Sequence, residues 1–121
     1  LKGDNIWVSI LFTDIALYST IIEHMSPETA VQFLNEYFSA MHDVIEEHDG
    51  QIINYIGDSV MVVFGAPISR VDDAERAVKT AIGMVESLKK FNKKRIDKGK
   101  VPINAGIGIN KGKTGFLFFQ K

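Results

Sequence analysis

An acidic residue in a tight turn between two apolar runs is the feature that most constrains the fold. Gly57-Asp58 separates the apolar residues 52–56 from the apolar residues 60–64. A small, flexible residue followed by Asp is typical of a two-residue hairpin turn. The pattern therefore predicts a β-hairpin made of residues 51–56 and 59–64, with Asp58 at its tip.

A second acidic residue closes another apolar run. Asp14 follows residues 8–13, whose β-branched and aromatic side chains predict a buried, central strand over residues 6–13. If this strand and the hairpin are neighbours in one sheet, their ends bring two carboxylates together, and two carboxylates can hold Mg²⁺ against a nucleoside triphosphate. Either aspartate alone has a more frequent, structural interpretation as a turn or capping residue. The presence of two such aspartates, each at the end of a predicted strand, favours a metal-binding site.

The composition indicates one ordinary globular domain. The chain has 121 residues, of which 45% are hydrophobic and 24% charged. Its net charge of −1 argues against a nucleic-acid-binding surface, and the absence of Cys excludes disulfides, thiolate zinc sites and cysteine nucleophiles. No apolar stretch is as long as a transmembrane helix. We expect a single cytoplasmic domain over residues 1–121, truncated from a longer protein that has attached sensor or membrane domains.

Three stretches predict helices. Residues 15–25 have apolar side chains at helical spacing, so a short helix is expected directly after Asp14. Ser26-Pro27 is typical of a helix start, and this second helix should run to about His48 and be ended by Gly50. Asp72-Asp73 opens the third, which ends in a basic run that complements the helix dipole. Its predicted buried stripe contains Ala74, Ala77, Val78, Ala81, Met84 or Val85, Leu88 and Phe91.

The remaining pattern completes the fold. Residues 101–109 predict a fourth strand, interrupted by Gly106 and Gly108, where another backbone or a ligand can come close. Residues 111–113 predict a turn, and residues 115–119 the start of a further strand. The order strand, helix, helix, strand, strand, helix, strand describes an α+β fold with a ferredoxin-like antiparallel sheet and helices on one face.

Four segments, in order, resemble the catalytic domain of class III adenylate and guanylate cyclases. VSILFTDI is similar to the family's first metal-binding strand and GQIINYIGDSVMVVFGAP to its second metal-binding hairpin. DDAERAVKTAIGM resembles the helix after the hairpin, and INAGIGINKGK the following strand and turn. Each motif is weak by itself, but four in register are a strong signal.

The resemblance implies a reaction and a set of site residues. Asp14 and Asp58 would hold two Mg²⁺ or Mn²⁺ ions, with the carbonyl of Ile15 as a further ligand. Backbone N–H groups would bind phosphate, and Asn54 stands at the base-selecting position. The phosphate-binding residues are Ala16, Leu17, Tyr18 and Ser19. The implied reaction converts ATP, or less readily GTP, to the 3′,5′-cyclic nucleotide and pyrophosphate in intracellular signalling. Family members act as homodimers or heterodimers of cyclase domains.

Three positions depart from the family pattern. Asn54 replaces a base-selecting Lys, Leu17 replaces a Gly, and Leu117-Phe118 replace a Gly-Asn pair. Residues that stabilise the transition state in the family lie beyond this chain, so we expect the isolated chain to have little or no activity. The alternative function is a catalytically inactive, dimerising regulatory module. A diguanylate cyclase would have a similar sheet and a similar pair of metal-binding carboxylates, but no GGDEF signature is present in this sequence.

Overall fold

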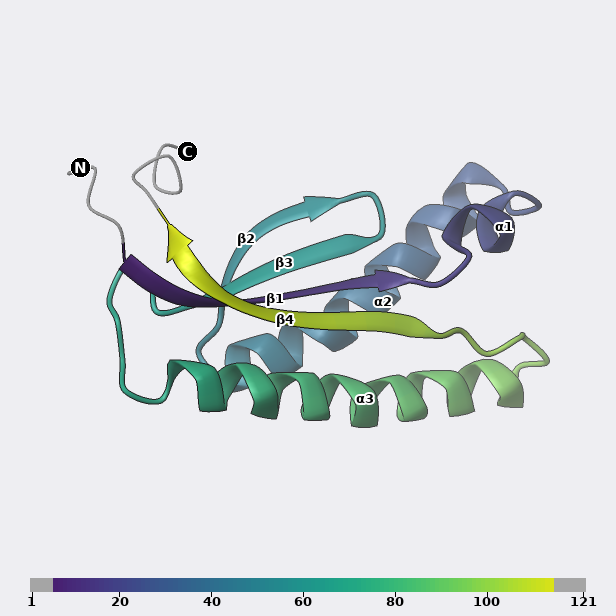
Figure 1. The fold of residues 1–121 in the computed structure, drawn as a ribbon. Coiled ribbons are helices and arrows are strands. Elements are labelled where there is room, and N and C mark those ends of the chain that lie inside the picture. The colour runs from purple at the N-terminus through teal and green to yellow at the C-terminus, as the bar shows by residue number, and fades with distance from the viewer. Residues whose placement is uncertain (1–5, 115–121) are drawn as a thin grey trace.

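The structure, a computed structural model, describes residues 6–114. Within them, the elements follow the predicted order. They are β1 (Ile6–Ile15), α1 (Tyr18–Ile22), α2 (Pro27–Glu47), β2 (Gln51–Ile56), β3 (Ser59–Phe64), α3 (Asp73–Asp97) and β4 (Ala105–Thr114). The strands form one antiparallel sheet in the order β2-β3-β1-β4, and both long helices lie on the same side of it (Figure 1). The predicted α+β, ferredoxin-like arrangement is confirmed.

Strand β1 is central because both of its edges are paired. It pairs with β3 from Ser9 to Thr13 and with β4 along its whole length. Its odd-numbered side chains from Ser9 to Ile15 are buried, whereas Phe12 and Asp14 on the other face are exposed. The prediction of a central strand is confirmed, but the strand continues two residues further and includes Asp14.

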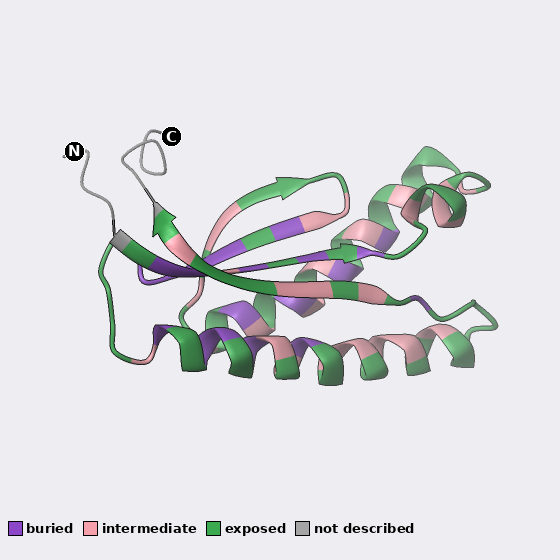
Figure 2. Cartoon of the chain, in the orientation of Figure 1, coloured by how far each residue is buried: buried purple, intermediate pink, exposed green. Residues whose placement is uncertain are grey.

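The hydrophobic core lies between the sheet and the inner sides of α2 and α3. Figure 2 shows the buried positions along the sides of these helices that face the sheet. Four α2 residues at helical spacing are buried: Phe33, Tyr37, Met41 and Ile45. In α3, Ala77 and Met84 face the core, whereas Ala74 is exposed and Val78 and Val85 are 49% and 45% exposed. The predicted buried stripe is therefore wrong at Ala74 and Val78, and Met84 rather than Val85 is its buried member. Within residues 6–114, no helix is both long and apolar enough to span a membrane.

The start and end of α2 lie where the sequence predicts, but the glycine after it has a different role. Ser26 caps the N-terminus through its side-chain oxygen. The helix ends at Glu47, and Asp49 rather than Gly50 adopts the left-handed conformation, with φ +56°. Gly50 provides space instead, because a Cβ there would lie 2.7 Å from Val62 Cγ1. Gly50 therefore lets the sheet approach closely, and the change of chain direction after the helix occurs at Asp49.

The fourth strand begins later and extends further than predicted. It starts at Ala105 rather than residue 101 and continues to Thr114. The predicted turn at residues 111–113 is wrong, because these residues pair with β1 as a regular part of the sheet. The strand predicted over residues 115–119 lies outside the described residues.

Two lysines explain part of this extension. The ammonium groups of Lys111 and Lys113 lie over the Trp7 ring of β1, 5.9 and 5.3 Å from its centroid. Each is within the range of a cation–π interaction. Local turn propensity is therefore overridden by pairing and side-chain contacts with a distant strand.

A buried arginine joins the start of α3 to the end of α2. Arg76 is 7% exposed, and its guanidinium donates to the carboxylates of Asp73 (2.6 Å) and Asp72 (3.1 Å). It also donates to the main-chain carbonyls of His48 (2.9 Å) and Asp49 (3.1 Å). These acceptors compensate for the desolvation of a buried charge. The cluster therefore fixes the position of the two helices relative to each other.

We expect Arg76→Met to lower the free energy of unfolding by about 3–5 kcal/mol, because removing one member of a buried ion pair leaves the other without compensation. The charge left behind is Asp73, which is 8% exposed. Arg70→Met is the matched control: Arg70 forms an exposed pair with Asp49 at 3.4 Å, and such pairs contribute about 1 kcal/mol or less. Urea unfolding followed by circular dichroism measures both changes. Equal losses in the two variants would contradict the assignment.

Candidate functional site

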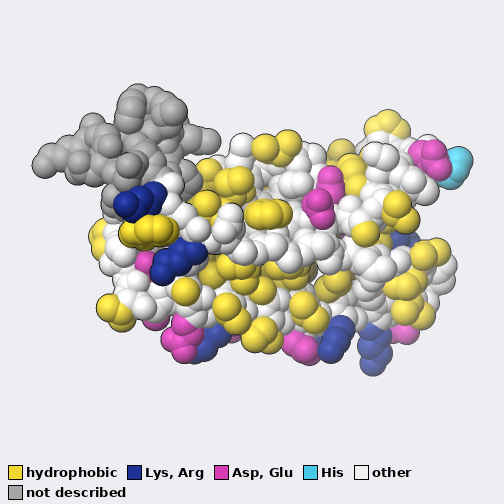
Figure 3. Space-filling view, in the orientation of Figure 1, with side chains coloured by type: hydrophobic (Ala, Val, Ile, Leu, Met, Phe, Trp, Pro, Cys, Tyr) yellow, Lys and Arg dark blue, Asp and Glu magenta, His cyan; other side chains and the backbone are white. Residues whose placement is uncertain are grey.

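The hairpin turn and the end of β1 meet at one end of the sheet. Because β3 runs alongside β1, with Val60 opposite Thr13, the β2–β3 turn lies beside Asp14. The Ile15 N–H donates a hydrogen bond to Asp58 Oδ2 at 2.7 Å. The predicted convergence of the two acidic strand ends is confirmed. Figure 3 shows acidic side chains grouped on the surface between this turn and the region of α1.

A glycine on the neighbouring strand leaves room for Asp14. Gly106 of β4 lies directly opposite Asp14, and a Cβ on it would be 3.1 Å from Asp14 Oδ1. Gly108 accommodates the Phe12 ring in the same way, at 2.8 Å. The sequence predicted a close approach at both glycines, but the groups that approach are side chains of β1. Any larger residue at position 106 would push against the carboxylate.

A buried tyrosine lies near the two carboxylates, and the sequence pattern assigned it only to the core. Tyr37 of α2 is fully buried, and its hydroxyl shares a 3.2 Å hydrogen bond with Thr13 Oγ1. Burial raises the pKa of Tyr37; the hydrogen bond between Tyr37 and Thr13 opposes this increase, and the charges of Asp58 and Asp14 add to it. This contact joins α2 to β1 at the residue before Asp14.

The segment after Asp14 differs from the predicted helix. Ile15 belongs to β1 and is buried opposite Ala105, and α1 is limited to Tyr18–Ile22. The Ala16 N–H donates to the Asn104 carbonyl at 2.8 Å. The predicted short helix is present, but it begins at Tyr18 rather than directly after Asp14, because Ile15 is part of β1 and is buried by the sheet. The predicted phosphate-binding N–H groups that lie at the helix start are those of residues 17–19, which have no intrahelical acceptor.

A β-bulge determines where Asn54 points. Ile52 pairs with Val62 and Asn54 with Met61, so Ile53 is an inserted residue in β2. Met61 is also opposite Phe12, and residues directly opposite one another share a face of the sheet. Asn54 is therefore exposed on the open face, the same face as Asp14. Without the inserted residue, it would pair with Val60 and face the helices.

The carboxylate oxygens of Asp14 and Asp58 are suited to a metal ion that is also bound by the phosphates of a substrate. Asp14 is exposed, and Asp58 keeps one carboxylate oxygen beyond the one bonded to Ile15. Within residues 6–114, no three His, Asp or Glu side chains are grouped closely enough to hold a metal by themselves. Mg²⁺ is commonly bound by one or two carboxylates together with substrate phosphates. The pair fits this kind of site rather than an all-protein metal centre.

Comparison with known proteins identifies the family. The model of the adenylate and guanylate cyclase catalytic domain matches residues 4–116. The chain therefore belongs to the family of adenylate and guanylate cyclase catalytic domains.

Individual relatives agree with this assignment. Adenylate cyclase 1 of Rhizobium meliloti (strain 1021) is 38% identical over 105 residues, which cover 87% of this chain and 16% of that protein. The structure of the guanylyl cyclase Cya2 matches with a TM-score of 0.88 at 39% identity, covering 95% of this chain and 58% of the other. The adenylyl cyclase CyaB from P. aeruginosa matches with a TM-score of 0.89 at 28% identity, covering 95% and 60%. The chain thus spans less than two thirds of each of these relatives.

One family position carries backbone strain. Leu17, which the sequence resemblance placed at a position where Gly is usual, adopts φ +57°, and its side chain is 77% exposed. The turn therefore does require the positive φ that a side chain disfavours. A left-handed residue with a Cβ costs roughly 1–2 kcal/mol. Because the Leu17 side chain is largely exposed, its burial does little to compensate for this cost.

We expect Leu17→Gly to raise the free energy of unfolding by about 0.5–1 kcal/mol, the strain relieved less the greater freedom of Gly in the unfolded chain. Ser19→Gly, in the regular part of α1, is the control and should lower it by about 0.5 kcal/mol. Thermal and urea unfolding of the three proteins measures the difference. A loss of stability in Leu17→Gly would show that the turn does not strain Leu17.

Proposed function

We propose that this chain supplies the metal- and phosphate-binding part of a nucleotide cyclase that converts ATP, and less readily GTP, to the 3′,5′-cyclic nucleotide and pyrophosphate in intracellular signalling. The observation that carries the proposal is the 2.7 Å hydrogen bond between Ile15 N–H and Asp58 Oδ2, which holds one carboxylate beside the residue that follows Asp14. The family assignment supports the reaction class. A cytoplasmic location stays a prediction.

The proposed metal ligands are Asp14, Asp58 and the carbonyl of Ile15. When bound there, two Mg²⁺ or Mn²⁺ ions supply Lewis-acid activation of the ribose 3′-hydroxyl and neutralisation of the triphosphate charge. The protein's own contribution is to hold the ligands in place. Asp58 is oriented by Ile15, and Asp14 occupies the space left open by Gly106. Such preorganised charge is worth more than flexible charge because it needs no rearrangement during the reaction.

The turn before α1 is proposed to bind the phosphates through main-chain N–H groups. Leu17, Tyr18 and Ser19 have N–H groups without an intrahelical acceptor at the start of α1. Ala16 joins them only if its hydrogen bond to Asn104 opens, because its N–H is already used there.

The open face of the sheet is proposed to bind the base and a second cyclase domain. Asn54 has both a donor and an acceptor for a purine edge. Phe12 and Met61 on the same face are 49% and 38% exposed, although each is a large apolar side chain. A second copy of the chain or a different cyclase domain would bury them, giving the homodimer or heterodimer that we propose for the active form.

We expect Asp14→Asn and Asp58→Asn each to reduce cyclic-nucleotide formation at least 10²- to 10³-fold, the scale of losing one preorganised transition-state contact. Asn keeps the size of Asp, and at position 58 it can still accept the hydrogen bond from Ile15. The exposed Asp43→Asn removes the same charge from α2 and should leave activity unchanged. Product is measured with Mn²⁺ and either ATP or GTP, in this chain and in any longer natural polypeptide that contains it.

The same assay separates the two functions. Product that disappears in both aspartate variants and persists in the control supports the cyclase. A longer natural polypeptide that contains this chain, is folded and dimeric, binds Mn²⁺ and yields no product from either triphosphate would overturn it. The inactive regulatory module would then be the better description, and the replacement of the family Lys by Asn54 would be its clearest mark.

We expect Asn54→Ala to lower kcat/KM for the preferred triphosphate roughly fivefold, since one hydrogen bond to a base contributes about 1 kcal/mol. The preference between ATP and GTP should narrow at the same time. Gln51→Ala is the control, because Gln51 is another exposed amide on β2. An unchanged ATP-to-GTP ratio in Asn54→Ala would contradict a base-selecting role.

A further inference from the structure

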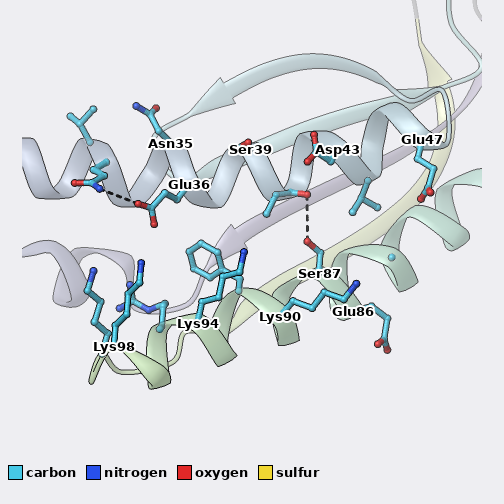
Figure 4. Close-up of a pocket in the computed structure, with 18 of the residues that line it drawn as sticks. Asn35, Glu36, Ser39, Asp43, Glu47, Glu86, Ser87, Lys90, Lys94 and Lys98 are labelled. Carbon is cyan, nitrogen blue, oxygen red and sulfur yellow. Dashed lines mark hydrogen bonds between the residues drawn. The ribbon is translucent and has the colours of Figure 1, made fainter.

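A second concave region lies on the helical side of the molecule. A pocket of about 480 Å³ forms where α1, the start of α2, the end of α3 and residues 99–103 meet. It shares Gln32, Glu36, Arg95 and Lys100 with the groove between α2 and α3 that Figure 4 shows. The apolar side chains that line it are Ile21, Met25, Phe33, Val101, Pro102 and Ile103. The site formed by Asp14 and Asp58 contributes no residue to this pocket.

Arg95 lies in the wall of this pocket and is held in place on two sides. Its guanidinium lies 4.9 Å from the centroid of the Phe33 ring, and its Nε donates to the Val101 carbonyl at 2.8 Å. Within residues 6–114, Arg95 forms no ion pair with a carboxylate, whereas Arg70 and Arg76 both do. Its terminal nitrogens are therefore positioned but not neutralised by an ion pair.

Two basic residues and one acidic residue line the pocket, whereas the adjoining groove has lysines near the pocket and acidic residues such as Asp43, Glu47 and Glu86 along α2 and α3. Lys100 lines it together with Arg95, and Lys94 and Lys98 line the adjoining groove. Figure 4 shows Lys94 and Lys98 extending from α3 on the side of α2. Glu36 is the acidic residue that lines the pocket, and it opposes the lowering of the Arg95 pKa that burial causes. A bound anion would add to this compensation.

We propose that this pocket binds an amphipathic carboxylate, with its carboxylate on the Arg95 guanidinium and its hydrocarbon part among the apolar side chains. A planar guanidinium matches a carboxylate through paired N–H donors. The pocket volume is within the range typical of small-molecule sites, which combine an apolar lining with a few fixed polar groups. The guanidinium requires a carboxylate in the ligand, and the apolar lining requires a hydrocarbon part.

The pocket is also connected to the turn that we propose to bind phosphate. The Asn92 side chain holds Ile103 on both sides, donating to its carbonyl at 2.7 Å and accepting from its N–H at 2.8 Å. The next residue, Asn104, accepts the Ala16 N–H. A ligand that contacts Ile103 is therefore separated from Ala16 by one step along the backbone, to Asn104, and one hydrogen bond.

Titration of the ¹⁵N-labelled 121-residue chain with sodium octanoate tests the proposal without any nucleotide. We expect saturable amide shifts at Ile21, Met25 and Ile103, with a smaller shift at Ala16. Affinity should rise about three- to fourfold for each methylene added from butanoate to octanoate, because each buried methylene contributes a fixed increment. Octan-1-ol, which lacks the charge, should bind more weakly by roughly tenfold or more.

Charge variants identify the group responsible. Arg95→Gln should weaken octanoate binding roughly tenfold or more and leave octan-1-ol binding nearly unchanged. Arg95→Lys keeps the charge and should retain part of the affinity, which guards against a loss caused by misfolding of the Gln variant. Lys93→Gln is the matched control on the same helix, since Lys93 is exposed and does not line the pocket.

Several results would overturn the proposal. They are shifts that map elsewhere or never saturate, equal binding of octanoate and octan-1-ol, and an equal loss of octanoate binding in Lys93→Gln and Arg95→Gln. An unmoved Ala16 amide during saturable binding would overturn the connection to the phosphate turn. Because the titration measures binding alone, failure of the cyclase activity would leave its outcome unaffected.

Discussion

The hydrogen bond from Ile15 N–H to Asp58 Oδ2 is the contact on which the candidate site depends. It joins two groups that are 43 residues apart in the sequence. The bond exists because β1 is paired along one edge with β3, which brings the hairpin turn to its end, and along the other with β4. Asp14 is positioned by the same pairing, between the turn on one side and Gly106 on the other. The central strand therefore builds the core and the site together.

One face of the sheet forms the core, and the other face is open to solvent. One face is covered by α2 and α3 and contains the main core, including Tyr37 and its bond to Thr13. The open face presents Phe12, Asp14, Met61 and Asn54, a mixture of exposed apolar and polar groups. The strict alternation of side chains along β1 makes this division possible. An apolar face that carries a carboxylate at its end is suited to binding rather than to remaining uncovered.

Close approach and backbone strain are distributed over different residues. Gly50 and Gly106 allow neighbouring groups to come near, whereas the residues other than glycine that have a positive φ within residues 6–114 are Leu17 and Asp49, each next to a helix. At Leu17 the strain coincides with the turn proposed to bind phosphate. Strained backbone is maintained only where the surroundings hold it, and here the Ala16–Asn104 hydrogen bond and the buried Ile15 hold the preceding residues.

The sequence by itself determined the order of the elements, the hairpin with Asp58 in its turn, the capped start of α2 and the pair of acidic residues that mark the site. These are local signals: turn residues, helix caps and short apolar periods act within a few neighbours. Only the tertiary structure decided that Ile15 belongs to β1, that β4 runs through residues 111–113, and that the bulge at Ile53 turns Asn54 to the open face. Each of these depends on pairing with a strand distant in sequence. A one-residue change in register reverses the face of every following side chain, so the local pattern could predict that strands exist but not which face each residue presents.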